Sequence, residues 1–559
     1  MPANRQYLET DYLIIGAGSA GCVLAARLSE NPDVSVLVLE AGGMDRFWDW
    51  QIRMPAALAY PMNGKRYSWD YHTEPEPNLN NRIMHCPRGR ALGGSSSING
   101  MVFVRGHAHD YDRWAAEDRC LTKWDYRHCL PYFIRSESVD VGRDDYRGDA
   151  GPQRVTRGST RHPLCAAFLA AAQAAGYPAT SDINGFQQEG FGPMDRSTGD
   201  GIRQSTAVTF LRPAMRRKNV KVLTRAFVRR LILDGKTARG VEFTRHGDSQ
   251  TALAAREVIL CGGPINNPQL LMLSGIGKAE NILPFGISVI HHLPGVGENL
   301  QDHLEIYVQM ECLKPVSLYK YYNAVGKFLV GAQWLFTRSG IGASNHFEVG
   351  GFVRSHRGIV HPNLQYHFFP MAVRYDGKNP SKRHGFQAHV GPMRSRSTGC
   401  VKLRSADPTA APRILFNYMS TNDDWEEFRA AVRLTREIFA QAPFDPYRGR
   451  ELMPGPRVLS NSDIDELVRN CVESAYHPSC SCKMGSDEFA VVDENCRVRG
   501  IENLRIVDSS IMPSIVSGNL NAPTIMIAEK AADLISGKPP PEPIDVPVYV
   551  ATDYAENQR

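Results

Sequence analysis

The spacing of apolar residues near the start of the chain predicts a strand, a helix and a second strand. A short apolar run at 12–15 leads into a glycine-rich turn, residues 23–28 favour a helix, and residues 34–39 form a second apolar run. Strands that are apolar throughout are typical of a parallel sheet with helices on its faces. The chain therefore predicts an α/β fold that begins with a β-α-β unit.

Later stretches carry equally clear patterns. Residues 163–175 and 521–536 predict helices, and residues 424–441 predict an amphipathic helix. Residues 220–246 predict consecutive strands joined by a tight turn. Three prolines follow Lys538, and the stretch from 538 to 559 contains few residues that could enter a core. We therefore expect a C-terminal tail that lies on the surface.

Composition and charge narrow the class of protein. Of 559 residues, 42% are hydrophobic and 22% are charged, which is typical of a globular chain. The net charge of +5 is small for this length, and no block of basic residues occurs, so we expect no nucleic-acid partner. The 12 scattered cysteines favour reduced thiols in the cytoplasm. We found neither a signal peptide nor an apolar run long enough to span a membrane, so we expect a cytoplasmic protein that could touch the inner face of the membrane peripherally.

A dinucleotide-binding motif follows the first predicted strand directly. Gly16, Gly18 and Gly21 form GxGxxG, with Ser19 and Ala20 at the start of the helix. The first glycine permits a tight turn, the second lets the backbone approach a pyrophosphate, and the third lets helix and strand pack closely. Glu40 ends the second strand, where a carboxylate can accept hydrogen bonds from ribose hydroxyls. The motif predicts a bound dinucleotide and leaves FAD and NAD both open.

Two longer motifs carry a resemblance to a known family. Residues 89–100 read GRALGGSSSING, and residues 263–277 read GPINNPQLLMLSGIG. Both resemble the signature motifs of the glucose-methanol-choline (GMC) oxidoreductases, which use FAD. The second motif departs from the family pattern at Asn267, where Ser or Thr is usual. The resemblance extends over residues 11–537, and the stretches 345–348 and 474–480 look most like those of choline-oxidising members.

The resemblance implies how the chain is divided and how FAD is held. The FAD-binding domain, with a Rossmann-like parallel sheet, would use 1–157, 220–310 and 466–537. An α+β substrate domain built on an antiparallel sheet would use 158–219 and 311–465. Ile98 stands where some choline oxidases have a histidine joined covalently to the flavin, so a non-covalent cofactor is expected. The further residues expected at FAD are Gly93, Gly94, Ser95, Ser96, Asn99, Val228 and Asp508.

The resemblance also selects the reacting residues. His477 is expected to act as acid and base, a task that suits imidazole near neutral pH. Asn521 matches the second active-site position, where its amide could hold the substrate oxygen. Glu305 matches a glutamate that meets the trimethylammonium group of choline, and aromatic faces also attract such a cation. The other expected substrate contacts are Trp69, Phe347, Tyr366 and His367.

The expected reaction is the oxidation of choline to betaine aldehyde, and then to glycine betaine, an osmoprotectant. Electrons would pass to oxygen or to a respiratory quinone. Two alternatives stay open: oxidation of another aliphatic or aryl alcohol, and the hydroxynitrile lyase activity of some family members. The pattern His107-Ala108-His109-Asp110 resembles half a metal site but lacks the spacing of common metal motifs. We therefore expect no metal.

Overall fold

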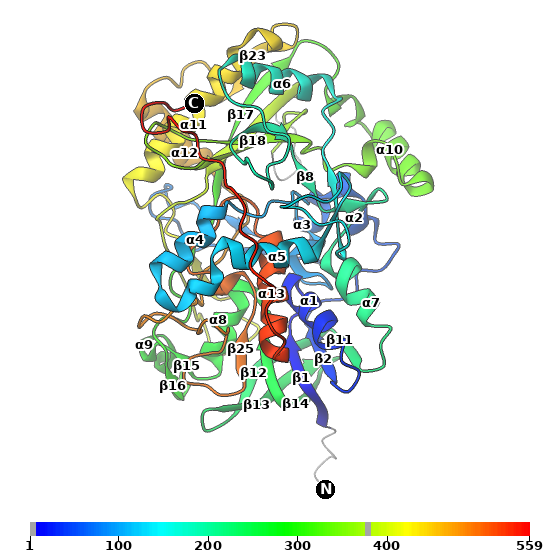
Figure 1. Cartoon of the computed structure of the whole chain (residues 1–559), viewed down its shortest axis with the longest axis vertical. Helices are drawn as coiled ribbons and strands as arrows, with labels where there is room; N and C mark the ends of the chain where they lie inside the picture. Colours follow the sequence, from blue (N-terminus) through cyan, green and yellow to red (C-terminus); the bar gives the residue numbers. More distant parts are fainter. Residues whose placement is uncertain (1–6, 375–381) are drawn as a thin grey trace.

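Two sheets lie one above the other along the long axis of the molecule, as seen in the computed structural model of residues 7–374 and 382–559 (Figure 1). The lower half contains both the N-terminal strand and the C-terminal helix, and the upper half contains the middle of the chain. The chain crosses between the halves several times, so residues distant in sequence meet where the two sheets face each other.

The lower sheet is seven-stranded. Its order is β11-β2-β1-β14-β13-β12, with β25 added to β14. The neighbours β11, β2, β1, β14 and β25 run parallel, whereas β12 and β13 extend the sheet as antiparallel strands. The strands are β1 Tyr7–Ile15, β2 Val36–Glu40, β11 Val220–Thr224, β12 Ala226–Asp234, β13 Thr237–Arg245, β14 Asp248–Leu260 and β25 Leu504–Ile506. The predicted β-α-β unit and the consecutive strands of 220–246 are confirmed.

Two largely buried helices, α1 and α13, pack against each other beside this sheet. Helix α1 (Ser19–Leu28) follows β1, and α13 (Asn521–Ser536) packs along it although some 500 residues separate them (Figure 1). Arg27 of α1 forms an ion pair with the buried Glu529 of α13. At the other end of α1, Ser19 Oγ donates to Asn521 Oδ1 at 2.9 Å, which places two helix N-termini beside each other at the same edge of the sheet.

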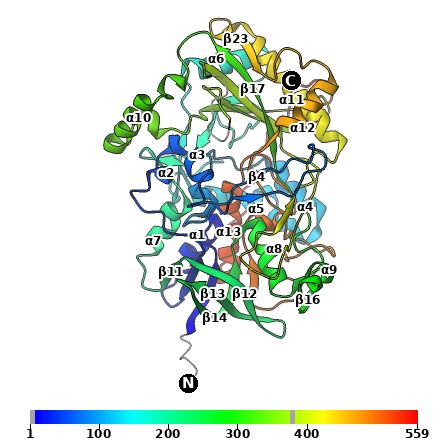
Figure 2. The ribbon, with the colours of Figure 1, turned by 180° about the vertical axis from the view of Figure 1, so that it is seen from behind.

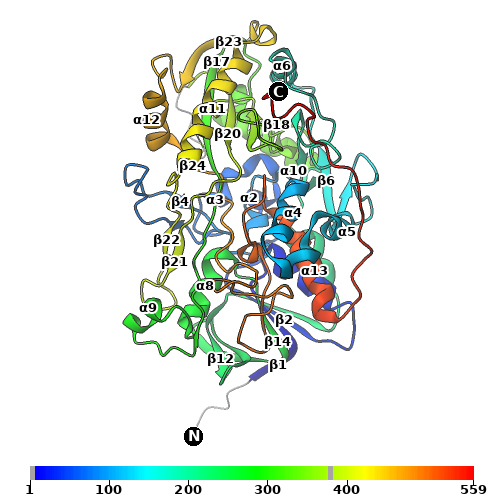
Figure 3. The same ribbon diagram turned by 60° about the vertical axis from the view of Figure 1, so that its left-hand side comes forward.

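The upper sheet is antiparallel throughout, with the order β23-β17-β20-β19-β18-β7. Helices α6 (Pro163–Ala174) and α11 (Asn422–Ala440) cover the outer face of this sheet (Figure 3). The helices predicted at 163–175 and 424–441 are thus confirmed, as is the one at 521–536. The strands are β7 Gly190–Pro193, β17 Leu304–Cys312, β18 Val349–Val353, β19 Leu364–Phe369, β20 Gly385–Pro392 and β23 Arg448–Met453.

Two contacts suggest different borders between the FAD-binding and substrate domains from those expected from the sequence. Strand β17 belongs to the upper sheet from Leu304 onward, six residues before the expected border at 310. The π-helical turn Ala207–Leu211 packs against α1 of the lower half. We therefore propose that the substrate domain begins near 304 and that residues 207–219 belong with the FAD-binding domain.

The C-terminal tail runs over the surface from the lower half to the upper half (Figure 3). Ile544 N donates to Arg127 O, and Tyr549 N donates to Phe186 O. At its end Arg559 pairs with Glu437 of α11. The tail therefore ties the two halves together as a strap. Among the described helices, none is both long and apolar enough to cross a membrane.

Candidate active site

The three glycines of GxGxxG meet different constraints. A Cβ on Gly16 would lie 2.6 Å from Cys261 O, and one on Gly21 would lie 2.0 Å from Gly16 O, so packing within the protein requires both glycines. A Cβ on Gly18 would meet only Cys261 O at an ordinary 3.7 Å. Gly18 therefore leaves an open cradle at the N-terminus of α1, where no side chain caps the first amides. Such a cradle fits a phosphate.

Glu40 ends β2 beside this turn. Its carboxylate accepts from Ala17 N at 2.9 Å and from Gly42 N at 2.7 Å. Burial raises the pKa of Glu40 to about 7, although the two amide hydrogen bonds oppose the shift. The carboxylate lines the cavity that starts at Gly16 and Gly18. A ribose with two hydroxyl donors fits this position.

The loop that contains the expected FAD contacts at 93–96 lies directly over this glycine-rich turn. Gly93 and Gly94 have φ angles of +86° and +52°, and a Cβ on Gly94 would lie 2.7 Å from Gly18 Cα. Ser95 Oγ accepts from Gly89 N, and Ser96 Oγ donates to Gly93 O, so both hydroxyls hold the loop's own shape. The two glycines therefore allow the loop backbone to lie close to Gly18.

A buried arginine supports the same loop from behind. Arg203 Nη1 donates to the backbone oxygen of Asn99 at 2.6 Å and to its side-chain oxygen at 2.7 Å. Burial lowers the pKa of Arg203 to about 9, and its Nη2 has no hydrogen-bond partner among the described residues. Arg203 does not line the cavity, so its hydrogen bonds to Asn99 act on the shape of the loop.

One cavity connects the dinucleotide turn with the upper sheet. Val228, Asp508, Ile98 and Asn99 line it, together with residues of both halves. Asp508 Oδ2 accepts from Gly263 N at 2.7 Å and from Asn267 Nδ2 at 2.8 Å, which ties the second signature motif to the end of β25. The cavity is therefore long enough to reach from Glu40 to His477, as FAD requires. Ile98 offers no nucleophile, and non-covalent binding stays a prediction.

The backbone at His477 is clamped by a buried carboxylate. Asp302 Oδ1 accepts from His477 N at 2.6 Å, and Oδ2 accepts from Ser474 Oγ and Tyr418 Oη. Tyr476 has a φ of +64°, and Arg88 donates to its carbonyl at 2.8 Å. These contacts aim the His477 ring into the cavity.

The hydrogen bonds around His477 decide where its proton lies. His303 Nε2 lies 2.8 Å from Met393 O, and because a carbonyl only accepts, Nε2 must carry the proton. Burial lowers the pKa of His303 to about 4, so its Nδ1 is a free acceptor. His477 Nδ1 lies 3.0 Å from that atom and must donate to it. His477 Nε2 is then left unprotonated and faces the cavity.

The amide that meets this nitrogen belongs to Asn519 and not to the expected Asn521. Asn519 Nδ2 donates to His477 Nε2 at 3.0 Å. Asn521 is the first residue of α13, and its Oδ1 accepts from Ser19 Oγ at 2.9 Å. Both asparagines line the cavity.

The substrate side of the cavity is formed by β19 and the segment before β18. His367 and Phe347 line the cavity, with their rings 5.8 Å apart. Gln365 Nε2 donates to His367 Nε2 at 3.0 Å and to Asn519 Oδ1 at 3.1 Å, so His367 is linked to the His477 group. Burial lowers the pKa of His367 to about 4. This wall is therefore neutral.

Neither Glu305 nor Trp69 forms part of this wall. Glu305 is buried behind it, with its carboxylate 2.9 Å from His389 Nδ1, and it does not line the cavity. The ring of His389 lies 5.5 Å from that of Phe347. Trp69 lines the cavity but packs against Phe227 of β12, beside Val228. Trp69 is therefore placed toward the dinucleotide end.

The structure corrects the expected role of Tyr366 as a substrate contact. Successive side chains of a strand point to opposite faces, so Tyr366 faces away from the cavity when His367 faces into it. Its hydroxyl lies 3.2 Å from Thr435 Oγ1 of α11, and its ring packs 5.3 Å from that of Phe191. Tyr366 therefore belongs to the core under α11 and not to a cation-binding cage.

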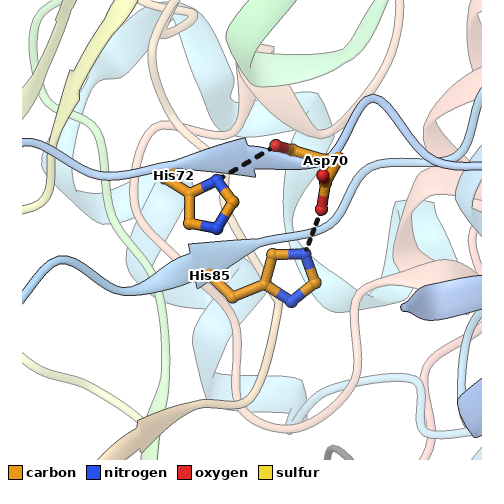
Figure 4. A group of neighbouring side chains, drawn as sticks. All are labelled: Asp70, His72 and His85. Atoms are coloured by element: carbon orange, nitrogen blue, oxygen red, sulfur yellow. Dashed lines mark hydrogen bonds and ion pairs between the residues drawn. The ribbon is translucent and has the colours of Figure 1, made fainter. Parts of the chain in front are cut away.

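A separate polar cluster lies on the short hairpin of β3 (Tyr71–His72) and β4 (His85–Cys86) (Figure 4). Asp70 Oδ1 lies 2.9 Å from His85 Nε2, and Asp70 O lies 3.1 Å from His72 Nδ1. The three side chains have the ligand types and spacing that a metal ion could use. No motif in the sequence predicted this group, and hydrogen bonds account for its geometry.

His107, from the sequence pattern that resembled half a metal site, caps helix α4 (Ala108–Glu117).

Comparison with known proteins identifies the family. Family models described as GMC oxidoreductase match residues 10–305 and 395–528. The chain belongs to the GMC oxidoreductases. The family prediction is confirmed, and with it the FAD cofactor and the predicted pair of sheets.

Relatives and solved structures of the GMC family align over nearly the whole chain. An oxygen-dependent choline dehydrogenase of Chromohalobacter salexigens is 55% identical over 99% of this chain and 100% of its own. Pyridoxine 4-oxidase from Mesorbium loti is 31% identical with a TM-score of 0.84, covering 95% of this chain and 100% of its own. A formate oxidase is 26% identical with a TM-score of 0.88, covering 96% and 99%. The fold is thus shared by enzymes named for different substrates.

Three residues of this GMC site were not predicted from the sequence: His303, Asn519 and Arg203. His303 lies two residues before the expected Glu305, and Asn519 lies two residues before the expected Asn521, so both are close to predicted site residues. Their roles depend on which side chains meet across the fold, and no spacing records that. Arg203 carried no sequence signal, since an isolated arginine is usually exposed.

Proposed function

We propose that this protein is an FAD-dependent choline dehydrogenase that converts choline to betaine aldehyde in the cytoplasm. The observation that carries the proposal is 55% identity, over 99% of the chain, to a relative named oxygen-dependent choline dehydrogenase. The neutral His477 group at the end of the dinucleotide cavity supports it, because oxidation of an alcohol requires removal of a hydroxyl proton.

FAD would supply the acceptor for a hydride from the substrate carbon, and Gly18, Glu40 and Gly94, which line the cavity, would help to hold it. His477 Nε2 is unprotonated and accepts the hydroxyl proton, while Nδ1–H stays bonded to His303 at 3.0 Å. The imidazolium that forms is stabilised because the lone pair of His303 accepts from it. Asn519, which now donates to Nε2 at 3.0 Å, can donate instead to the substrate oxygen. Asn521 and His367 line the same space and can complete the oxygen's hydrogen bonds.

The cationic head of choline can make no N–H hydrogen bond, so recognition must come from rings and negative charge. Phe347 offers a ring at the cavity wall, and the carboxylate of Glu305 lies behind it, bonded to His389. The charge of a buried carboxylate acts over a longer distance than that of an exposed one, because water screens it less. We propose that Glu305 attracts the cation without touching it.

Betaine aldehyde, the first product, can be oxidised again at the same residues. Hydrated betaine aldehyde again presents a hydroxyl on a carbon that carries hydrogen, so His477 could remove its proton in the same way. Each oxidation transfers two electrons and yields first the aldehyde and then glycine betaine. We propose oxygen or a quinone as the final acceptor of these electrons.

A neutral analogue of choline tests the proposal. 3,3-Dimethylbutan-1-ol has the shape of choline without its charge. We expect kcat/KM for choline to exceed that for the analogue by at least tenfold, and Glu305→Gln to reduce this ratio toward one. Equal values for both substrates in the unaltered enzyme would instead support oxidation of a neutral alcohol. The oxidation product should be identified by mass spectrometry in both cases.

A further inference from the structure

One buried side chain of the upper sheet forms two hydrogen bonds to residues of the site without lining the cavity. Gln365 belongs to β19 and lies on the same face as His367, two residues further along the strand. Its Nε2 lies 3.0 Å from His367 Nε2 and 3.1 Å from Asn519 Oδ1. Gln365 itself does not line the cavity. It would therefore act on a substrate through these two partners.

The hydrogen bond to Asn519 joins the two halves of the molecule. Strand β19 lies in the upper sheet, and Asn519 lies two residues before α13 of the lower half. Figure 2 shows α13 below the upper sheet, in which β17 is labelled. The side chain of Asn519 is thus held from the upper half, although its backbone enters the site from the lower half.

The orientation of the Asn519 amide is set by His477. An amide can lie in either of two orientations, and its hydrogen bonds decide between them. Met393 O and His303 together leave His477 Nε2 without a proton. A lone pair requires a donor, so Asn519 must present Nδ2 to His477 and Oδ1 to Gln365.

The amide of Gln365 is oriented in turn by Asn519. Because Asn519 Oδ1 only accepts, Gln365 must present its NH2 group to that oxygen. The second hydrogen of this group meets His367 Nε2, which must also accept. Burial lowers the pKa of His367 to about 4, so the ring is neutral and its proton lies on Nδ1. One chain of hydrogen bonds therefore fixes the amide of Asn519 and the tautomer of His367.

Proton transfer to His477 would disturb this arrangement if the amide were free to turn. Once Nε2 carries the hydroxyl proton, Nε2–H and Asn519 Nδ2–H are two donors that face each other. The negatively charged substrate oxygen can accept from both when it lies between them. An amide that turned round would instead offer Oδ1 to Nε2–H. The substrate oxygen would then lose one of its two donors.

We propose that Gln365 is a positioning residue that keeps the Asn519 amide from turning round and holds His367 in its Nδ1–H form. The bond from Gln365 Nε2 to Asn519 Oδ1 must break before the amide can turn. The donor for the developing oxyanion is thus fixed in advance, which is the arrangement that stabilises such charge best. This inference rests on the proposed oxidation of an alcohol, but not on choline being that alcohol.

The other charged and titratable groups at His477 meet it through separate contacts. Asp302 accepts from its backbone N–H at 2.6 Å, and His303 accepts from Nδ1–H at 3.0 Å. Arg88 donates to the carbonyl of the preceding residue at 2.8 Å. None of these contacts includes Gln365. A substitution at Gln365 therefore leaves them in place.

A double-mutant cycle on the FAD-loaded enzyme tests the proposal. Gln365→Met keeps the length of the side chain but removes the donor. It should lower the limiting rate of flavin reduction by about 10–10²-fold, the scale on which misplaced groups slow reactions, with little change in the apparent Kd for substrate. In the Asn519→Ala background it should lower the rate by less than about twofold, because partners in one network are not additive. Equal losses in both backgrounds would overturn the proposal.

A second variant reverses the chain of hydrogen bonds without changing its shape. The carboxylate of Gln365→Glu only accepts, so the Asn519 amide should turn round and present Oδ1 to His477 Nε2. Because that oxygen favours a proton on Nε2, the fall of kcat/KM in acid should begin at higher pH. The shift should be largely lost in Gln365→Glu/Asn519→Ala. A shift of the same size in the double variant would assign it to the carboxylate charge alone and overturn the proposed link.

A measurement without substrate separates this proposal from the choice of alcohol. Nitrogen NMR shifts of the resting holoenzyme should show His367 Nε2 without a proton, and a proton on that atom would overturn the proposal. If choline fails to reduce the flavin, the proposed substrate is wrong, and the same cycle is measured with the alcohol that does. Gln188→Met is the matched control, since it removes a buried amide that donates to Gly106 O at 3.1 Å. It should leave the limiting rate and the pH profile unchanged.

Discussion

His477 and His303 meet through their Nδ1 atoms at a distance of 3.0 Å. Because Met393 O fixes the proton of His303 on Nε2, this contact fixes the proton of His477 on Nδ1. The reactive nitrogen of His477 is therefore prepared as a base before substrate arrives. Two residues 174 positions apart thus determine the protonation state on which the proposed chemistry depends.

Substitution of His303 tests this relationship. His303→Leu removes the acceptor for His477 Nδ1–H and should lower kcat/KM by about 10² or more, the scale of general-base catalysis. His303→Gln can donate to Met393 O and still accept from His477, so it should recover much of the loss. Stopped-flow flavin reduction measures both variants. Equal defects in the two variants would mean that the contact is only structural.

The pH profile follows from the burial of His477. Burial, with the neighbouring His303 and His367, lowers the pKa of His477 well below its usual range. The neutral ring is the base, so kcat/KM should stay level from pH 8 down past the ordinary histidine pKa of about 6.5. It should fall only in more acid solution, where the ring becomes protonated. A loss of activity centred at pH 7 or above would contradict this assignment.

Stability should decrease in acid because of the same burial. His303 and His367 have pKa values lowered to about 4 in the folded protein, while the unfolded chain takes up protons from about 6.5. The unfolded state therefore binds more protons between pH 6.5 and 4, and the free energy of unfolding falls as pH falls through that range. Urea unfolding at several pH values measures the slope. His303→Gln should reduce the slope by about one proton.

The two asparagines should differ in their effects. Asn519→Ala removes the amide that meets His477 and should lower the rate of flavin reduction by about 10²–10³, the usual cost of losing one donor to a developing oxyanion. Asn521→Ala removes a contact to Ser19 and should affect FAD retention more than the rate. Flavin content and reduction rate are measured on each. A larger rate defect in Asn521→Ala would restore the assignment made from the sequence motif.

Glycine substitutions separate cofactor binding from folding. Gly18→Ala has room within the protein but fills the cradle beside the phosphates, so it should fold and lose FAD affinity by tenfold or more, about 1.4 kcal/mol. Gly21→Ala would place its Cβ 2.0 Å from Gly16 O and should fail to fold stably. The ratio of flavin to protein absorbance and the melting temperature measure the two effects. Full flavin content in Gly18→Ala would contradict the placement of the phosphates.

Much of this architecture was predictable because local patterns determine it. The run at 12–15, the glycines at 16–21 and Glu40 specify a β-α-β unit whatever the remainder of the chain does. Tyr366 was also within reach, since strand alternation places it opposite His367. The pairing of His477 with His303 and Asn519 was not, because it depends on how loops from three separate segments approach each other. Side-chain direction in such loops leaves no periodic signal.

We propose that this site removes a proton from choline while a hydride passes to FAD. The most direct test mixes the yellow enzyme with choline without oxygen and follows absorbance near ~450 nm, since only hydride transfer bleaches the oxidised flavin. We expect rapid bleaching by choline and little by benzyl alcohol or ethanol, with His477→Ala abolishing it. Bleaching by a neutral alcohol but not by choline would contradict the proposed substrate. Absence of bleaching by all three alcohols would contradict the proposed choline chemistry.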